Sequence, residues 1–305
     1  MVESTGARRT SVKLGSCIAG IPVTLHYSFF LLLLVEFINA IRYRRYPIFM
    51  LFVVVLYGPV LLITILVHEY GHAFTNKKLG GNVEEIVLWP LGGYAVCGPT
   101  EALSGDLKVA LAGPLTHIPM ACIWWGVYEA VTEGNEGVWP GWVIYLDVLS
   151  DSVAGFFQIL SGEAFYMNLI LLCFNLLIPA YPLDGGRIFS ASLILYFRLS
   201  PLKAAKISAG TALFLSTGMM LYAIYGFFTG TGGSGLLLGL VGAFVFSSSY
   251  ELWGLAKRNQ LTNHPIFGRE CYRPSGDGGS TTDGYGGAQA EDDAVPAQTD
   301  SAVLA

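Results

Sequence analysis

Charged residues are scarce in this sequence. Only 13% of its 305 residues are Asp, Glu, Lys or Arg, while 53% are hydrophobic, and an ordinary soluble domain carries about 25% charged residues. This mixture cannot form a water-soluble surface. The net charge of -5 and the lack of a basic patch also exclude a nucleic-acid-binding surface. The sequence therefore predicts an integral membrane protein that is surrounded by the lipid bilayer and has no nucleic-acid partner.

Cysteine and histidine are also scarce. The five cysteines are scattered without CxxC spacing, so we interpret them as small buried hydrophobic residues of the apolar segments. The five histidines are too few for the histidine boxes of membrane di-iron desaturases.

Long apolar runs predict an all-α polytopic membrane protein with about six transmembrane helices. A helix needs about 20 mostly apolar residues to cross the hydrocarbon core. The predicted spans cover residues 24–41, 49–75, 104–130, 163–180, 203–229 and 234–256. Residues 188–198 are amphipathic and too short to cross, which predicts a buried or re-entrant helix.

Composition divides the chain into three parts. Residues 1–23 form an N-terminal segment, and residues 24–258 form the membrane-embedded domain. Residues 259–305 are rich in Gly, Ser, Thr, Asp and Ala. They are too poor in large apolar residues to form a core, so they predict a disordered polar tail.

Residues 82–97 break the helical pattern and predict a small membrane-associated β element. The segment NVEEIVLWPLGGYAVC is short, rich in β-branched residues and interrupted by Pro90 and a Gly-Gly pair. Unpaired strand edges cannot face lipid, so this strand or hairpin must lie against protein or line a wet cavity. Beside an active site, such an edge can pair with an extended peptide.

The distribution of Lys and Arg predicts the orientation of the chain. Basic residues concentrate in the N-terminal segment, in the second and fourth loops and after the last span, although residues 42–45 of the first loop hold three arginines. Basic segments stay on the cytoplasmic side of membranes. Both termini are therefore predicted to lie in the cytosol, or in the stroma or matrix of an organelle.

A metal-binding motif lies at the end of the second predicted span, where residues 68–72 read HEYGH. Positions four apart share one face of a helix, so His68 and His72 can bind one metal ion. Glu69 is then placed to take a proton from metal-activated water. Ionisable side chains at membrane depth are costly and usually functional, so a polar cap at the membrane interface is the weaker interpretation.

A second motif, NLLIPAYPLDGGR at residues 175–187, supplies a candidate third ligand. Its two prolines break the helix, and its Gly-Gly pair permits a tight turn next to Asp184. An unwound backbone at membrane depth is tolerated only around a cavity, so Asp184 is expected to point into one. Catalytic zinc takes three protein ligands and keeps one position open, and Asp184 fits the third.

Together these motifs resemble the site-2 proteases, a family of intramembrane zinc metalloproteases. The resemblance rests on HEYGH at 68–72, AGPL at 112–115 and NLLIPAYPLDGGR at 175–187, with support from VTLHYSF at 23–29 and LWPLGGYA at 88–95. These pieces follow the family's order and span nearly the whole membrane body. The chain has neither the PDZ-like insertion nor the nucleotide-sensing modules of many relatives, so it is similar to the compact branch.

The resemblance implies roles for individual residues. His68, His72 and Asp184 match the ligands of one Zn²⁺ per chain, Glu69 matches the general base, and Asn175 matches a position near the substrate. The family's site lies inside the membrane and opens to the cytosolic side, and its substrate is a transmembrane protein. Any regulator is expected to be a separate membrane protein or the polar tail.

Three other polar residues lie near these motifs. His26 matches a histidine in one branch of the family. Two roles stay open for it: a polar group that faces the wet cavity, or a contact with the substrate. His117 is interpreted as a hydrogen-bonded structural residue rather than a metal ligand. Arg187 is expected to pair with a carboxylate or with helix carbonyls.

Four other functions fit the sequence less well. The GxSG of rhomboid serine proteases occurs at 232–235, but no span after it holds a histidine. The CAAX-type membrane metalloproteases take their third ligand from an ExxxD that the later spans lack. A zinc transporter needs a ladder of ligands across the membrane. A membrane chaperone or binding scaffold that keeps the fold without catalysis remains the alternative to a protease.

Overall fold

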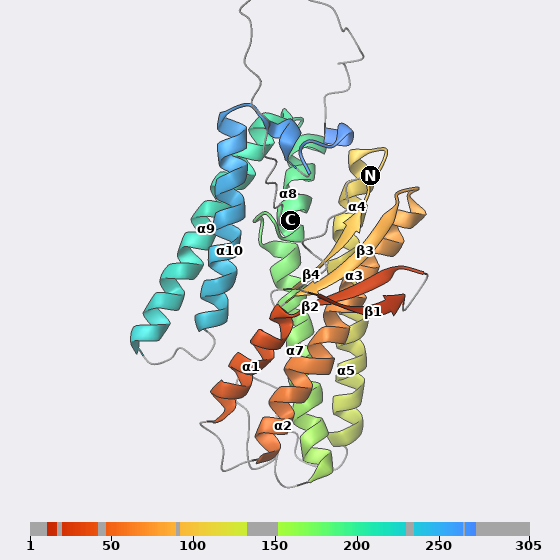
Figure 1. Ribbon diagram of the computed structural model, residues 1–305, viewed down its shortest axis with the longest axis vertical. Helices are drawn as coiled ribbons and strands as arrows, with labels where there is room; N and C mark the ends of the chain where they lie inside the picture. Colours follow the sequence, from red (N-terminus) through yellow and green to blue (C-terminus); the bar gives the residue numbers. More distant parts are fainter. Residues whose placement is uncertain are drawn as a thin grey trace, which may run out of the picture.

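The computed structural model describes residues 11–16, 20–41, 47–89, 92–132, 152–229, 235–264 and 266–272. Helices form most of this part of the chain, and a small sheet lies against them (Figure 1). The helices are α1 Ser28–Ala40, α2 Pro47–Val55, α3 Leu61–Lys78, α4 Leu103–Leu115, α5 His117–Thr132, α7 Val153–Leu177, α8 Asp184–Leu195, α9 Pro201–Thr229 and α10 Gly235–Lys257. The strands are β1 Ser11–Ser16, β2 Pro22–His26, β3 Val83–Trp89 and β4 Gly92–Cys97.

Five stretches of the described residues are long and apolar enough to cross a membrane: Pro47–Lys78, Leu103–Thr132, Val153–Leu177, Pro201–Thr229 and Leu237–Lys257. They correspond to five of the six predicted spans. Two of these stretches each combine two helices. In Pro47–Lys78, the π-helical turn η3, Leu56–Val60, joins α2 to α3 around Pro59. In Leu103–Thr132, α4 ends one residue after Pro114 and α5 begins at His117.

The predicted boundaries of the first and fourth spans are wrong. Residues 24–26 belong to β2, and α1 has only 13 residues, which rise about 20 Å at 1.5 Å per residue. The first span is therefore shorter than predicted, and the count of six is not confirmed. The fourth span, α7, starts at Val153, ten residues earlier than predicted, and ends at Leu177, ahead of Pro179.

The sheet contains the predicted hairpin and two strands that were not predicted. Its order is β1-β2-β3-β4, with β2 and β3 parallel and the other pairs antiparallel. The hairpin β3–β4 falls within the predicted segment 82–97. One face of the sheet packs on α3, where Ile86 and Leu88 share an apolar cluster with Ile65 and Ala73. The packing fixes β4, an edge strand of this sheet, beside α3.

The helices form two groups (Figure 1). Helices α9 and α10 pair along most of their length. Four alanines of α9 are fully buried, and such small side chains let neighbouring helices approach closely: Ala204, Ala205, Ala209 and Ala212. The remaining long helices form the other group, next to the sheet. Helix α8 lies between the groups and contacts α4, α7 and α9. It matches the buried or re-entrant helix predicted at 188–198, although it begins at Asp184.

Two predictions about buried and exposed residues are corrected. Residues 259–272 were placed in the disordered tail, yet their apolar side chains Ile266, Phe267 and Tyr272 are buried in a cluster with α4, α8, α9 and α10. The rest of the predicted tail, 273–305, lies outside the described residues. Four of the five cysteines are also not buried as predicted, because Cys122 and Cys173 are exposed and Cys97 and Cys271 are half-buried. The fifth, Cys17, lies outside the described residues.

Phe267 tests the packing of the segment after α10. Its ring is 4% exposed, and deleting a buried Phe side chain costs about 3–5 kcal/mol. Phe267→Ala should therefore lower the free energy of unfolding by that amount, measured by denaturant unfolding of the purified protein in detergent. Phe228→Ala is the matched control, since Phe228 is 81% exposed. Equal effects of the two substitutions would contradict the packing described here.

Candidate metal centre

Helix α3 carries the first half of the site. His68 and His72 lie one turn apart on it, and both side chains are buried. Their Nε2 atoms are 3.1 Å apart. The i, i+4 spacing predicted to bring these two imidazoles together is thus confirmed in geometry.

Helix α8 carries the second half. After α7 ends, residues 178–183 are not helical, and Asp184 is the first residue of α8. The two glycines that follow permit this turn, because a Cβ on Gly185 would lie 2.2 Å from the Ile178 carbonyl oxygen and one on Gly186 would lie 2.4 Å from the Tyr181 nitrogen. The Asp184 carboxylate therefore stays at the helix N-terminus, where the helix dipole favours negative charge.

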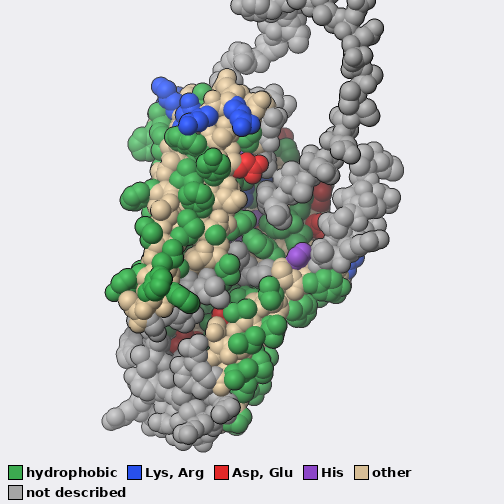
Figure 2. Space-filling view, turned by 60° about the vertical axis from the view of Figure 1, so that its left-hand side comes forward, with side chains coloured by type: hydrophobic (Ala, Val, Ile, Leu, Met, Phe, Trp, Pro, Cys, Tyr) green, Lys and Arg blue, Asp and Glu red, His purple; other side chains and the backbone are tan. Residues whose placement is uncertain are grey.

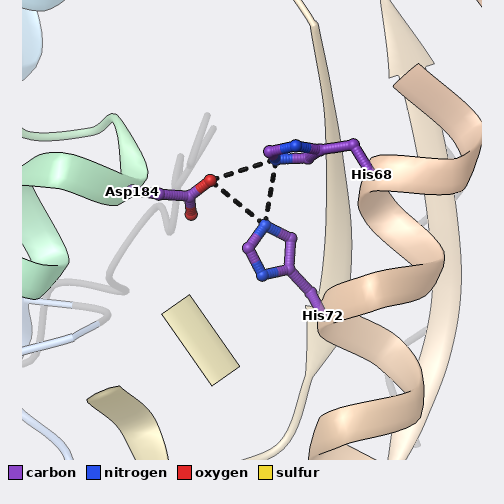
Figure 3. Close-up of side chains that lie close together, drawn as sticks. All are labelled: His68, His72 and Asp184. Carbon is purple, nitrogen blue, oxygen red and sulfur yellow. Dashed lines mark hydrogen bonds and ion pairs between the residues drawn. The ribbon is translucent and has the colours of Figure 1, made fainter. Parts of the chain in front are cut away.

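The three side chains converge on one point (Figure 3). Asp184 Oδ2 lies 3.0 Å from His68 Nε2 and 3.2 Å from His72 Nε2. Their candidate ligand atoms all lie within 4.8 Å of one another, the one such cluster of three among the residues that the structure describes. Around tetrahedral zinc, two nitrogen ligands at 2.0–2.1 Å would be roughly 3.3 Å apart, so the spacing suits zinc.

Hydrogen bonds outside the cluster leave lone pairs directed into it. His72 Nδ1 lies 2.7 Å from the Val109 carbonyl oxygen, which can only accept. In the neutral ring the proton is therefore on Nδ1, and Nε2 presents a lone pair to the Asp184 carboxylate. Two acceptors at this distance repel each other unless a cation lies between them. The donor set thus fits a metal ion, and both histidines would bind it through Nε2.

His68 is oriented by a chain of hydrogen bonds. Its Nδ1 lies 3.1 Å from His117 Nε2, and His117 Nδ1 lies 3.0 Å from Asn168 Oδ1. Asn168 Nδ2 in turn donates to the Ala164 carbonyl. These contacts agree with a proton on each Nδ1, which leaves His68 Nε2 free to bind metal. The hydrogen bonds expected of His117 are present, and its structural role stays a prediction.

Gly113 makes room for the two imidazoles. A Cβ at this position would lie 2.2 Å from His72 Nε2 and 2.8 Å from His68 Nε2. Gly71 has a similar role between the helices, because its Cβ would lie 2.7 Å from the Ala112 carbonyl oxygen. Close approach of α4 to α3 at these two glycines therefore closes one side of the site.

Glu69 lies between the metal ligands and the sheet. Its side chain is buried, and the Ala95 backbone of β4 is hydrogen-bonded to it. A Cβ on Gly93 would lie 2.7 Å from Glu69 Cγ. The strand β4 thus runs directly beside the carboxylate that was predicted to act as the general base.

The other predicted residues lie around this centre. Asn175 is half-buried in the last turn of α7, and its carbonyl oxygen is close to Gly185. His26 ends β2 and accepts a hydrogen bond from the Ser28 backbone N–H at the start of α1. Neither contact tests the roles predicted for these two residues.

An ion-pair network stands behind Asp184. Arg187 Nη1 is 3.9 Å from Asp184 Oδ1, and Arg187 Nη2 is 3.1 Å from Asp106 Oδ1. The prediction that Arg187 pairs with a carboxylate is confirmed. Asp106 was not predicted from the sequence, although an acid at the start of an apolar span was a usable signal. Asn168 was not predicted either.

Comparisons with known proteins show which proteins this chain is similar to. The model of peptidase family M50 matches residues 57–221. Zinc metalloprotease MJ0392 of Methanocaldococcus jannaschii is 32% identical over 209 residues, which are 68% of this chain and 52% of that protein. Rip3 of Mycobacterium tuberculosis is 30% identical over 194 residues, 63% of this chain and 44% of that protein. This chain spans about half the length of these curated relatives.

The similarity to one solved structure covers a larger share of both chains than the similarity to these relatives. The site-2 protease from Methanocaldococcus jannaschii superposes with a TM-score of 0.54 and 29% sequence identity. The similarity covers 80% of this chain and 95% of that chain.

Gly113 offers a direct test of the metal centre. Gly113→Ala would place a methyl group against both Nε2 atoms, so it should weaken zinc binding. We expect a loss of at least about tenfold in affinity, because mutating a residue that orients metal ligands usually costs at least that much. The measurement is the zinc dissociation constant by chelator competition. Gly126→Ala in α5 is the control, because its Cβ would meet no atom within 4 Å. Unchanged zinc affinity in Gly113→Ala would place the metal elsewhere.

Proposed function

The chain belongs to peptidase family M50, and we propose that it is a zinc endopeptidase that cleaves a peptide bond within or near a transmembrane segment of another membrane protein. The observation that carries this proposal is the convergence of two α3 histidines and the α8 aspartate inside a largely apolar helical body. The names of the similar proteins, zinc metalloprotease and site-2 protease, support it.

In this proposal, each residue of the centre has one role. His68, His72 and Asp184 hold one zinc ion per chain. Zinc bound there would supply the Lewis acid that activates a water molecule and polarises the substrate carbonyl. Glu69 takes a proton from the attacking water and later delivers it to the departing amine, so the C–N bond breaks and the carboxylate of Glu69 is restored.

The substrate is presented in extended form. An intact helix hides its carbonyl groups in hydrogen bonds, so a transmembrane substrate must unwind locally before cleavage. We propose that β4 pairs with the unwound segment, because it is an edge strand and touches Glu69. Asn175, on the α7 turn before the unwound residues, is proposed to contact the substrate near the developing oxyanion.

The proposal includes an orientation in the membrane. Figure 2 shows Lys and Arg gathered at one end of the α9–α10 pair and hydrophobic side chains over the rest of that face. This end holds Lys203 and Lys206, near the start of α9, and Lys257, in the last turn of α10. By the positive-inside rule we assign this end to the cytosolic side, or to the stroma or matrix of an organelle. Helix α1 is proposed as a sixth, shorter membrane element.

Glu69 and Asp184 separate catalysis from metal binding. Glu69→Gln should retain one zinc per chain and lower the cleavage rate at least about a hundredfold, since general base catalysis contributes 10²–10⁴-fold. Asp184→Asn should lose both zinc and activity. Metal analysis and cleavage of a single-pass membrane protein, with and without a zinc chelator, measure the two effects.

Three outcomes would contradict the proposal. Wild-type cleavage by Glu69→Gln would refute the assignment of the base, and full zinc content in an active Asp184→Asn protein would refute that of the third ligand. Zinc binding without turnover across a broad panel of membrane substrates would favour the non-catalytic scaffold. Proteomic comparison of wild type with Glu69→Gln in the native host would identify the substrates.

A further inference from the structure

The segment that follows α10 folds back onto the helices. It contains two 3₁₀ turns, Leu261–Asn263 and Glu270–Tyr272. Its apolar side chains join the cluster that α4 and α8 also form. We call residues 261–272 the C-terminal clamp. It lies outside residues 57–221, which match the family model.

The clamp holds Asp106 through two side chains. Arg269 Nη1 donates to Asp106 Oδ1 at 2.8 Å, and the Tyr272 hydroxyl donates to Asp106 Oδ2 at 2.9 Å. Arg269 Nη2 also lies 3.5 Å from the carbonyl oxygen of Cys97, at the end of β4. The clamp therefore connects the last residues of the described chain to both α4 and the sheet.

Asp106 links the clamp to the metal centre. Its Oδ1 also accepts from Arg187, whose other Nη atom faces the Asp184 oxygen that does not face the histidines. Charges therefore alternate in the order Asp184, Arg187, Asp106, Arg269. Because Asp106 is only 1% exposed, its carboxylate is costly unless it stays paired. Without Arg269, Arg187 would be drawn towards Asp106 and away from Asp184.

The clamp also contacts the unwound residues before Asp184. The His264 ring packs on the Tyr181 ring with a centroid distance of 4.8 Å, and Tyr181 lies three residues before Asp184. Burial, and next the charge of Arg269, lower the pKa of His264 to about 4. The neutral ring can then accept from the backbone N–H groups of Ile266 and Phe267, which fixes the turn of the clamp.

We propose that the C-terminal clamp is a positioning element for the third zinc ligand, acting from Arg269 through Asp106 and Arg187 on Asp184. Arg269 contacts Asp106 and the Cys97 carbonyl and is not one of the proposed zinc ligands. Its effect is to keep Arg187 beside the outer oxygen of Asp184, so that the other oxygen faces the two histidines. This inference rests on the proposed zinc site and adds a residue from beyond the family's matched region.

The test compares four full-length variants in detergent: Arg269→Gln, Arg269→Lys, Tyr272→Phe and, as control, Arg258→Gln. Arg258 is exposed and directly follows α10. The readouts are the zinc dissociation constant, the ligand-field spectrum of the Co²⁺-substituted protein and the melting temperature. Arg269→Gln should weaken zinc binding about tenfold, as outer partners of metal ligands do, and should change the Co²⁺ spectrum. Arg269→Lys should restore part of the affinity, and Arg258→Gln should match the wild type.

Several results would overturn the inference. One is an Arg269→Gln protein with wild-type zinc affinity and an unchanged Co²⁺ spectrum, while Asp184→Asn binds zinc poorly. If Arg269→Gln does not fold, Tyr272→Phe decides, since it removes one hydrogen bond to Asp106 and keeps the ring. A lower melting temperature of Tyr272→Phe without any change in zinc affinity or spectrum would show a purely structural clamp. A wild-type chain that binds no zinc would instead refute the proposed function itself.

Discussion

A polar centre inside an apolar helical body must satisfy its own charges and hydrogen bonds, because lipid and apolar side chains cannot do so. In this protein three lone-pair atoms, from His68, His72 and Asp184, face one another within hydrogen-bond distance. The outer atoms of the same side chains each have a partner. The arrangement of α3, α4, α5 and α8 follows from this requirement, since each of these helices supplies either a ligand or the partner of one.

The groups that hydrogen-bond or pair with the outer atoms of the three ligands come from several helices. Helix α4 supplies a carbonyl to His72, and His117, the first residue of α5, connects His68 to Asn168 on α7. Arg187 lies between two carboxylates and pairs with both, Asp184 and Asp106, the latter at the start of α4. Such contacts fix the orientation and basicity of metal ligands. Small residues are equally necessary, because the helices can bring these groups together only where Gly71 and Gly113 leave room.

The local half of the site could be predicted from the sequence together with its geometry, whereas the distant half could be predicted only as a candidate ligand. Two histidines four residues apart in an apolar helix determine their own relative position. Asp184 was marked by its Pro and Gly neighbours, but its distance to the histidines depends on the packing of α8, which no local pattern encodes. The hairpin 82–97 was predictable from its β-branched residues. Strands β1 and β2 were not, because β2 continues directly into the apolar run of α1.

The least predictable element was the segment after α10. It was grouped with the Gly-, Ser-, Thr-, Asp- and Ala-rich residues that follow it, although it has only one Gly and one Thr of these types and carries several large side chains. Those side chains, among them Phe267 and Tyr272, are buried in the structure. The average polarity of a sequence window therefore predicts burial poorly where a short segment packs through only a few large side chains. Ion pairs such as that of Arg269 with Asp106, 163 residues apart, produce no local sequence pattern.

The order of the ligands along the chain has a consequence for biosynthesis. His72 precedes Asp184 by 112 residues, and α4, α5 and α7 lie between them. A ribosome must therefore translate and deliver several further helices to the membrane before the third carboxylate is available. Until then the growing polypeptide holds only a two-histidine site, so the timing of synthesis itself keeps a newly made chain from completing its metal centre early.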